Sequence, residues 1–130
     1  MVDYLKGIDC SLFILAYDHN APNLEHLQET HFGVYEEFRK THKNTPIIMI
    51  SAVNYRENYK VKAKRNKIIK DTYDKAIASG DKNVYFLSGK NLIPKSAYED
   101  CFVDITHPND LGFYFIANTI YKFIKKHKII

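Results

Sequence analysis

The sequence predicts an α/β fold of three layers, in which helices cover both faces of a parallel sheet of about three strands. Three short apolar runs, at residues 11–17, 47–52 and 83–87, are each bounded by polar residues, as buried strands are. Helical periodicity occupies the stretches between and after these runs. Alternating strands and helices favour right-handed crossovers, which make neighbouring strands parallel. A length of 130 residues with 45% hydrophobic content suits one domain, residues 1–130, with its own core.

The first strand, residues 11–17, is apolar on both faces, which is typical of a central strand with a neighbour on each side. A helix is then expected over residues 24–42. Its acidic Glu25 lies early and its basic Arg39 lies late, which suits the helix dipole. The residues that recur at helical spacing, and so define its inward side, are Leu24, Leu27, His31, Val34, Tyr35 and Phe38.

The second strand, residues 47–52, begins just after Pro46 breaks the helical pattern. The next helix is expected over residues 61–79, and Gly80 has the right place for a C-terminal cap. The third strand, residues 83–87, follows at once.

Residues 90–101 show no regular period, and a last helix is expected over residues 109–126. The sheet then has three strands, whereas about four to six are usual for this architecture. At a sheet edge, the first strand would also leave an apolar ladder unpaired. These two observations predict further strands before Met1.

Composition narrows the function classes. The net charge of +4 is mildly basic, and no nucleic-acid-binding module accompanies it, so we expect no nucleic-acid partner. The basic run at residues 60–67 is interpreted as a solvated helix start, although positive charge there is unfavourable to the helix dipole. Cys10 and Cys101 are expected to be reduced thiols, with a disulfide as the open alternative.

The beginning of the sequence does not resemble a signal peptide, and the longest apolar run is too short to cross a bilayer. We therefore expect a cytoplasmic protein with no membrane partner. No metal site is expected, because the histidines do not have the spacing of a ligand set: His19, His26, His31 and His42.

Polar residues with chemical potential follow the predicted strands. Asn20 comes just after the first strand, Ser51 ends the second, and Asp104 and His107 precede the last helix. The carboxyl ends of parallel strands meet at one edge, so we expect these residues to share one rim. Asp104, three residues before His107, could orient its imidazole for general acid–base catalysis. Taken alone, the same two residues are more typical of a helix N-terminus with a surface histidine, and Asn20 is more typical of a turn.

Three blocks resemble one enzyme superfamily. Residues 104–113 (Asp-Ile-Thr-His-Pro-Asn-Asp-Leu-Gly-Phe) resemble the last conserved block of the SGNH hydrolases, the GDSL-like esterases and lipases. Residues 17–22 (Tyr-Asp-His-Asn-Ala-Pro) are similar to its third block, and residues 80–86 to one bacterial branch. The resemblance implies a flavodoxin-like fold and cofactor-free hydrolysis of a small-molecule ester, such as an acetyl or short acyl group on a carbohydrate.

The resemblance also implies residue roles. His107 would be the general base, Asp104 its orienting partner and Asn20 an oxyanion donor, which favours the catalytic interpretation of all three. Asp18 and His19 are expected to fix the loop beside the pocket.

The sequence departs from the family pattern where the nucleophile belongs. The family carries a serine in a Gly-x-Ser context before the Asn block, but only 19 residues precede Asn20 and no serine here follows such a glycine. Ser51 lies on the expected rim and is the only serine that we would test as a nucleophile, but we interpret it as a pocket residue. We therefore expect the C-terminal part of an SGNH domain whose serine lies outside this chain. The alternative is a non-catalytic fragment that self-associates, or pairs with a complementary piece, through an exposed edge strand.

Overall fold

The computed structural model describes residues 2–53 and 59–130. Its sheet has three parallel strands in the order β1 (Phe13–Leu15), β2 (Ile47–Ile50) and β3 (Val84–Leu87). Phe13 is aligned with Ile47, and Ile47 with Val84, so the three strands run in step. The predicted α/β class and parallel sheet are confirmed.

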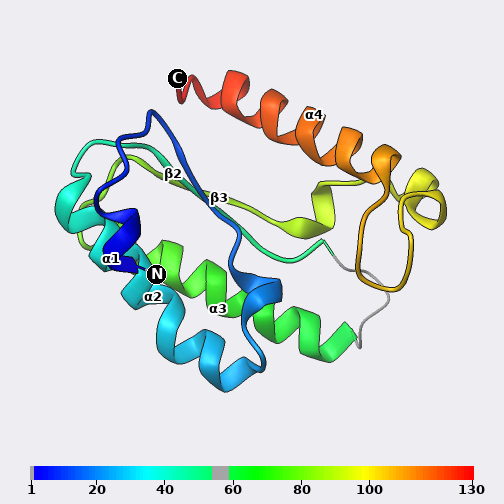
Figure 1. Cartoon of the computed structure of the whole chain (residues 1–130), viewed down its shortest axis with the longest axis horizontal. Helices are drawn as coiled ribbons and strands as arrows, with labels where there is room; N and C mark the ends of the chain where they lie inside the picture. The colour runs from blue at the N-terminus through cyan, green and yellow to red at the C-terminus, as the bar shows by residue number, and fades with distance from the viewer. Residues whose placement is uncertain (1, 54–58) are drawn as a thin grey trace.

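Helices lie on both faces of this sheet (Figure 1). α2 (Leu24–Thr41) and α3 (Tyr59–Ala78) lie together on one face, and α4 (Asp110–His127) crosses the other. Short helices complete the chain: α1 (Val2–Leu5), η1 (Asp18–Asn20), η2 (Gly89–Asn91) and η3 (Lys95–Asp100). The described part of the chain has no helix that is long and apolar enough to cross a membrane.

The alternation of side chains along β2 divides the core in two. Ile47 and Met49 face α2 and α3, while Ile48 and Ile50 face α4. All four are buried, as expected of a central strand in a parallel sheet. The α2 residues predicted to point inward are largely buried as well: Leu27, His31, Val34, Tyr35 and Phe38.

Local capping explains where the long helices begin and end. The Asn23 side chain accepts a hydrogen bond from the backbone N–H of His26, and Asn109 does the same for Gly112. Gly80 has a φ of 90°, the left-handed conformation that a C-terminal cap requires, so its predicted role is confirmed. The irregular segment 90–101 contains the short helix η3, whose 3₁₀ geometry leaves little periodic signal in the sequence.

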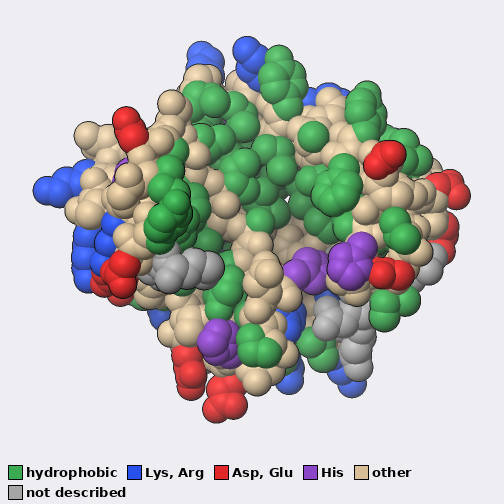
Figure 2. Space-filling model, in the orientation of Figure 1, with side chains coloured by type: hydrophobic (Ala, Val, Ile, Leu, Met, Phe, Trp, Pro, Cys, Tyr) green, Lys and Arg blue, Asp and Glu red, His purple; other side chains and the backbone are tan. Residues whose placement is uncertain are grey.

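β1 lies at the edge of the described sheet, although its composition predicts a central strand. Leu15 is buried, but Ile14 is 39% exposed. Figure 2 shows that hydrophobic side chains gather in a hollow between α4 and the sheet on the viewed face. The apolar pattern of β1 predicts a strand that is covered on both faces, but in this structure β1 is only partly covered.

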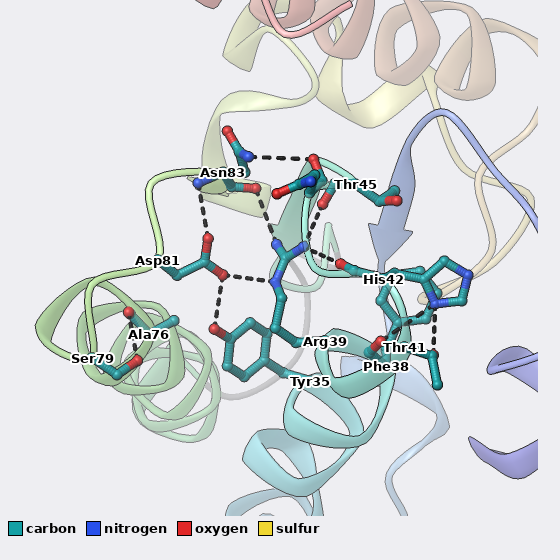
Figure 3. A network of polar contacts seen from close by, with 11 residues as sticks. Tyr35, Phe38, Arg39, Thr41, His42, Thr45, Ala76, Ser79, Asp81 and Asn83 are labelled. Atoms are coloured by element: carbon teal, nitrogen blue, oxygen red, sulfur yellow. Dashed lines mark hydrogen bonds and ion pairs between the residues drawn. The ribbon is translucent and has the colours of Figure 1, made fainter.

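A polar cluster joins α2 to the amino ends of the strands, opposite the predicted rim (Figure 3). Asp81 accepts hydrogen bonds from the Tyr35 hydroxyl at 2.8 Å and from Arg39 Nε at 2.9 Å. Arg39 also donates to the backbone carbonyl of Thr45, two residues before β2. Burial, and then the hydrogen bond to Asp81, raise the pKa of Tyr35 to about 12. This cluster fixes the sheet from the end that carries none of the predicted site residues.

Candidate functional site

Asp104 and His107 form a hydrogen-bonded pair in the loop before α4. His107 Nδ1 lies 2.8 Å from Asp104 Oδ2. The other carboxylate oxygen, Oδ1, accepts from the backbone N–H groups of Thr106 and His107, each at 2.7 Å. These bonds, first the one from the His107 side chain, lower the pKa of Asp104 to about 2. The carboxylate is therefore ionised near neutral pH, and Nδ1 carries the proton between the two groups.

The second ring nitrogen of this pair is available for chemistry. The His107 side chain is 76% exposed, and its Nε2 makes no hydrogen bond to any residue that the structure describes. With the proton held on Nδ1, Nε2 presents its lone pair outward. This is the arrangement of a general base whose tautomer is fixed by a carboxylate.

The loop that carries the pair is closed at its base. Val103 N–H donates to the His107 carbonyl at 2.8 Å, and Asn109 N–H donates to the Cys101 carbonyl at 2.9 Å. Gly112 sits against this closure, since a Cβ atom there would lie 2.3 Å from the Cys101 oxygen. The glycine of the Asp-x-x-His block is thus required by close backbone contact.

Asp18 anchors the loop that follows β1. Its side chain is buried, accepts from the Ala52 N–H at 2.7 Å, and forms an ion pair with Arg65 at 3.0 Å. Arg65 donates as well to the backbone carbonyls of Asp18 and Ala21. The predicted anchoring role of Asp18 has a physical basis in these bonds. Arg65 was not singled out by the sequence analysis.

Asn20 ends the η1 turn that Asp18 holds in place. Its side chain is exposed and makes no hydrogen bond to a described residue. The Asn20 backbone N–H donates to the Tyr17 carbonyl at 3.0 Å, which fixes the turn and leaves the side-chain amide available to a ligand. His19 lines a cavity described below.

Ser51 is held in a buried hydrogen-bond network. Its Oγ donates to Asn66 Oδ1 at 2.7 Å and accepts from the Gly89 N–H at 2.9 Å. Asn66 Oδ1 accepts a second bond, from Ser88. The serine is only 3% exposed and has no basic partner among these contacts, so its hydroxyl joins the ends of β2 and β3. Asn66, which organises this network, was also missed by the sequence analysis.

Two cavities share a wall at the carboxyl ends of the strands. One of about 410 Å³ is lined by residues of α3 and of the loops after β2 and β3. A smaller one of about 130 Å³ is lined mainly by aliphatic side chains of the sheet and α4, including Ile14 and Ile116. Asp18 and Ser51 contribute to both, so the structure brings these two predicted residues together. Asp104 and His107 line neither cavity, and neither does Asn20.

The model of the GDSL-like lipase/acylhydrolase family matches residues 1–125. The chain belongs to this family. Among solved structures, a candidate GDSL-like lipase from Bacteroides ovatus is 27% identical, superposes with a TM-score of 0.83, and is matched over 96% of this chain and 38% of its own. SsfX3, a salicylyl-acyltransferase from a tetracycline biosynthetic pathway, is 16% identical with a TM-score of 0.81, over 99% of this chain and 41% of its own. The second likeness shows the fold alone. No curated protein matches.

The family membership confirms the resemblance seen in the sequence. This GDSL-like chain spans less than half the length of either solved chain. The α/β architecture that positions Asn20 after β1 and the Asp104–His107 pair before α4 is thus the architecture of GDSL-like lipases. Hydrolase chemistry is the activity that the family name indicates.

Proposed function

We propose that this chain supplies the acid–base and oxyanion-binding half of an ester hydrolase. The observation that carries the proposal is the contact of 2.8 Å between Asp104 Oδ2 and His107 Nδ1, with Nε2 of the same histidine turned to solvent. The nucleophile is a serine outside these 130 residues, because no serine of the sequence lies in a Gly-x-Ser context.

In the proposed reaction, His107 Nε2 takes the proton of that serine as its oxygen bonds to the ester carbonyl carbon. His107 then returns the proton to the departing alcohol as the ester C–O bond breaks, which leaves an acyl-enzyme. Water, deprotonated by the same nitrogen, then bonds to the acyl carbon, and His107 returns the proton to the serine oxygen as the bond between serine and the acyl group breaks and the acid is released. Asp104 holds the imidazole in the correct tautomer throughout, and the exposed amide of Asn20 donates to the oxyanion.

We propose that the ester substrate carries a small acyl group, such as an acetyl or short acyl group on a carbohydrate. The smaller cavity supports this choice, because about 130 Å³ of mainly aliphatic lining accommodates a short acyl chain but not a fatty acyl chain. A series of p-nitrophenyl esters of increasing acyl length tests this point, and kcat/KM is expected to be highest for the shortest chains.

Ester hydrolysis is tested by comparing two preparations. One is the isolated 130-residue chain, and the other is the native preparation, which contains the gene product as the cell makes it together with any chain that copurifies with it. We expect turnover of p-nitrophenyl acetate only in the native preparation. His107→Ala should lower kcat by about 10³–10⁴-fold and Asn20→Ala by about 10²-fold. His127→Ala is the matched control, since His127 is an exposed histidine at the C-terminal end of α4. Absence of turnover in both preparations contradicts the proposal, and turnover by the isolated chain contradicts an external serine.

The second candidate function is self-association without catalysis, which one observation favours. β1 is a sheet edge, and Ile14 on it remains 39% exposed. Sedimentation of the isolated chain distinguishes this candidate: a concentration-dependent dimer that Ile14→Lys abolishes would support it. A monomer at all concentrations would exclude it.

A further inference from the structure

We propose that the outward face of α4, together with the basic end of that helix, binds the surface of a membrane that contains anionic phospholipids. This inference is independent of the proposed esterase function, because it uses neither Asp104 nor His107. The expectation of no membrane partner depends on the lack of an apolar run that could cross a bilayer, and binding at a membrane surface requires no such run.

One face of α4 presents apolar and aromatic side chains to solvent. Leu111 is 43% exposed, Tyr114 62% and Tyr121 58%. Their spacing of three and seven residues places them on one side of the helix, away from Ile116, which packs against the core. Among the eighteen residues of α4, all of which the structure describes, only Gly112 is buried. The helix therefore covers the sheet with one side and leaves an apolar stripe on the other.

The C-terminal half of α4 adds positive charge that no carboxylate of the same segment offsets. Residues 111–130 contain four lysines and no acidic residue. The four lysines are exposed and make no ion pair with a residue that the structure describes: Lys122, Lys125, Lys126 and Lys128. The lysines of α3 show the contrast, since Lys67 pairs with Asp71 and Lys70 with Asp74.

The aromatic and basic groups of α4 lie side by side. Lys125 Nζ is 5.8 Å from the ring centroid of Tyr121, one helical turn earlier. Figure 2 shows basic and hydrophobic side chains together along the top edge of the molecule, where Figure 1 places α4. The helix dipole accounts for basic residues in the last turn, but it does not account for exposed tyrosines beside them.

This combination suits the interface of an anionic bilayer. Tyrosine rings lie at the level of the lipid headgroups, aliphatic side chains enter the acyl boundary, and lysines are attracted by the negative surface potential. A second copy of the chain is a poorer match, because its residues 111–130 supply no carboxylate to meet the four lysines. A nucleic acid would match the lysines and stack on the tyrosines, but it offers no apolar phase to Leu111.

The test measures cosedimentation of the 130-residue chain with sucrose-loaded vesicles. We expect binding to phosphatidylcholine vesicles with about 30 mol% phosphatidylserine, weaker binding as salt rises from about 50 to 500 mM, and no binding to phosphatidylcholine alone. K125Q/K126Q should lower the partition coefficient by about 20-fold or more, because each lysine near such a surface contributes about fivefold. K67Q/K70Q removes the same formal charge from α3 and should lower it by no more than about twofold.

Y121S tests the aromatic part of the surface, with Y4S as its matched control. Tyr4 is 78% exposed on α1, which contacts α2 on the face of the sheet opposite α4. Y121S should weaken vesicle binding by about threefold or more, because it removes an apolar ring from the membrane interface, whereas Y4S should change binding by less than about 1.5-fold. All these variants replace exposed side chains, and matching thermal melts verify that they fold.

Equal losses in the two lysine variants, or equal binding to both kinds of vesicle, would overturn the inference. Binding of a fluorescent single-stranded RNA that K125Q/K126Q abolishes, without vesicle binding, would replace the membrane by a nucleic acid. Self-association that Y121S abolishes, again without vesicle binding, would replace it by a second copy. Vesicle binding should be unchanged in His107→Ala, so a failure of this inference is distinguishable from a failure of the proposed esterase function.

Discussion

Replacing Arg65 by methionine should be among the most damaging single changes in the chain. The Arg65 guanidinium donates to the Asp18 carboxylate at 3.0 Å and to the carbonyls of Asp18 and Ala21 at 2.7 and 3.1 Å. The side chains of Arg65 and Asp18 are only 11% and 3% exposed. Methionine preserves the aliphatic stem but leaves the Asp18 carboxylate buried without a counter-charge.

The expected cost follows from this burial. Removing one member of a buried ion pair costs about 3–5 kcal/mol, because the remaining charge is neither solvated nor paired. A domain of this size is stabilised by about 5–15 kcal/mol in total. Arg65→Met should therefore remove at least about a fifth of the free energy of unfolding. It should also loosen the η1 turn that carries Asn20.

Urea unfolding measures the effect, with Lys67→Met as the control. Lys67 is on the same helix and pairs with Asp71, but its side chain is 72% exposed, so its loss should cost less than about 0.5 kcal/mol. A double-mutant cycle with Asp18→Asn should return a coupling energy above about 1 kcal/mol, since the asparagine leaves no buried charge behind. If Arg65→Met costs less than about 1 kcal/mol, the structural role assigned to this pair is wrong.

Three further predictions concern other parts of the site. Gly89→Ala should destabilise the fold by about 2 kcal/mol or more in urea unfolding, because its Cβ would lie 2.0 Å from the Ala52 carbonyl oxygen, whereas Gly33→Ala, with nothing within 4 Å, should be neutral or stabilising. Burial lowers the pKa of His31 from 6.5 to about 4, so the unfolded chain binds the proton over this interval and stability should fall by about 3 kcal/mol as pH drops through it. His31→Gln should make the free energy of unfolding nearly independent of pH over this interval. A variant with the same pH dependence as the parent chain would contradict the role given to His31. Ser51 should resist labelling by a fluorophosphonate, since its hydroxyl is buried and bonded to Asn66; labelling detected by peptide mass spectrometry and lost in His107→Ala would make it a nucleophile.

Most of the fold could be predicted because its signals are local. Residues 47–50 form a continuous apolar run because all four are buried in the central strand of the sheet. The end of α3 was readable from Gly80, whose left-handed backbone only a few residue types tolerate. The edge position of β1 was not readable, because apolar composition reports the environment a strand suits and not how many neighbours it has in this chain.

Arg65 shows where the sequence analysis lost information that was present. The basic run was interpreted as a solvated helix start, yet Arg65 shares helical spacing with Ile69, Thr72 and Ala76, all buried. A basic residue on the inward face of a helix indicates a buried acidic partner. Following that periodicity one turn back toward the N-terminus would have predicted a partner for Arg65. It would not have identified Asp18, which lies 47 residues away.

The two aspartates of the site explain why one half of it was predictable and the other was not. The hydrogen bonds that Asp104 makes to described residues all lie within three residues, to Thr106 and His107. The short block that contains them therefore specifies the pair without help from the rest of the fold. Asp18 depends on Ala52 and Arg65, 34 and 47 residues away, which only the assembled sheet brings together. An exposed, self-contained pair can be carried by sequence motif alone, whereas a buried anchor needs tertiary structure. We therefore expect Arg65→Met to leave the Asp104–His107 hydrogen bond intact in any folded fraction, and NMR detection of the His107 Nδ1 proton would show it.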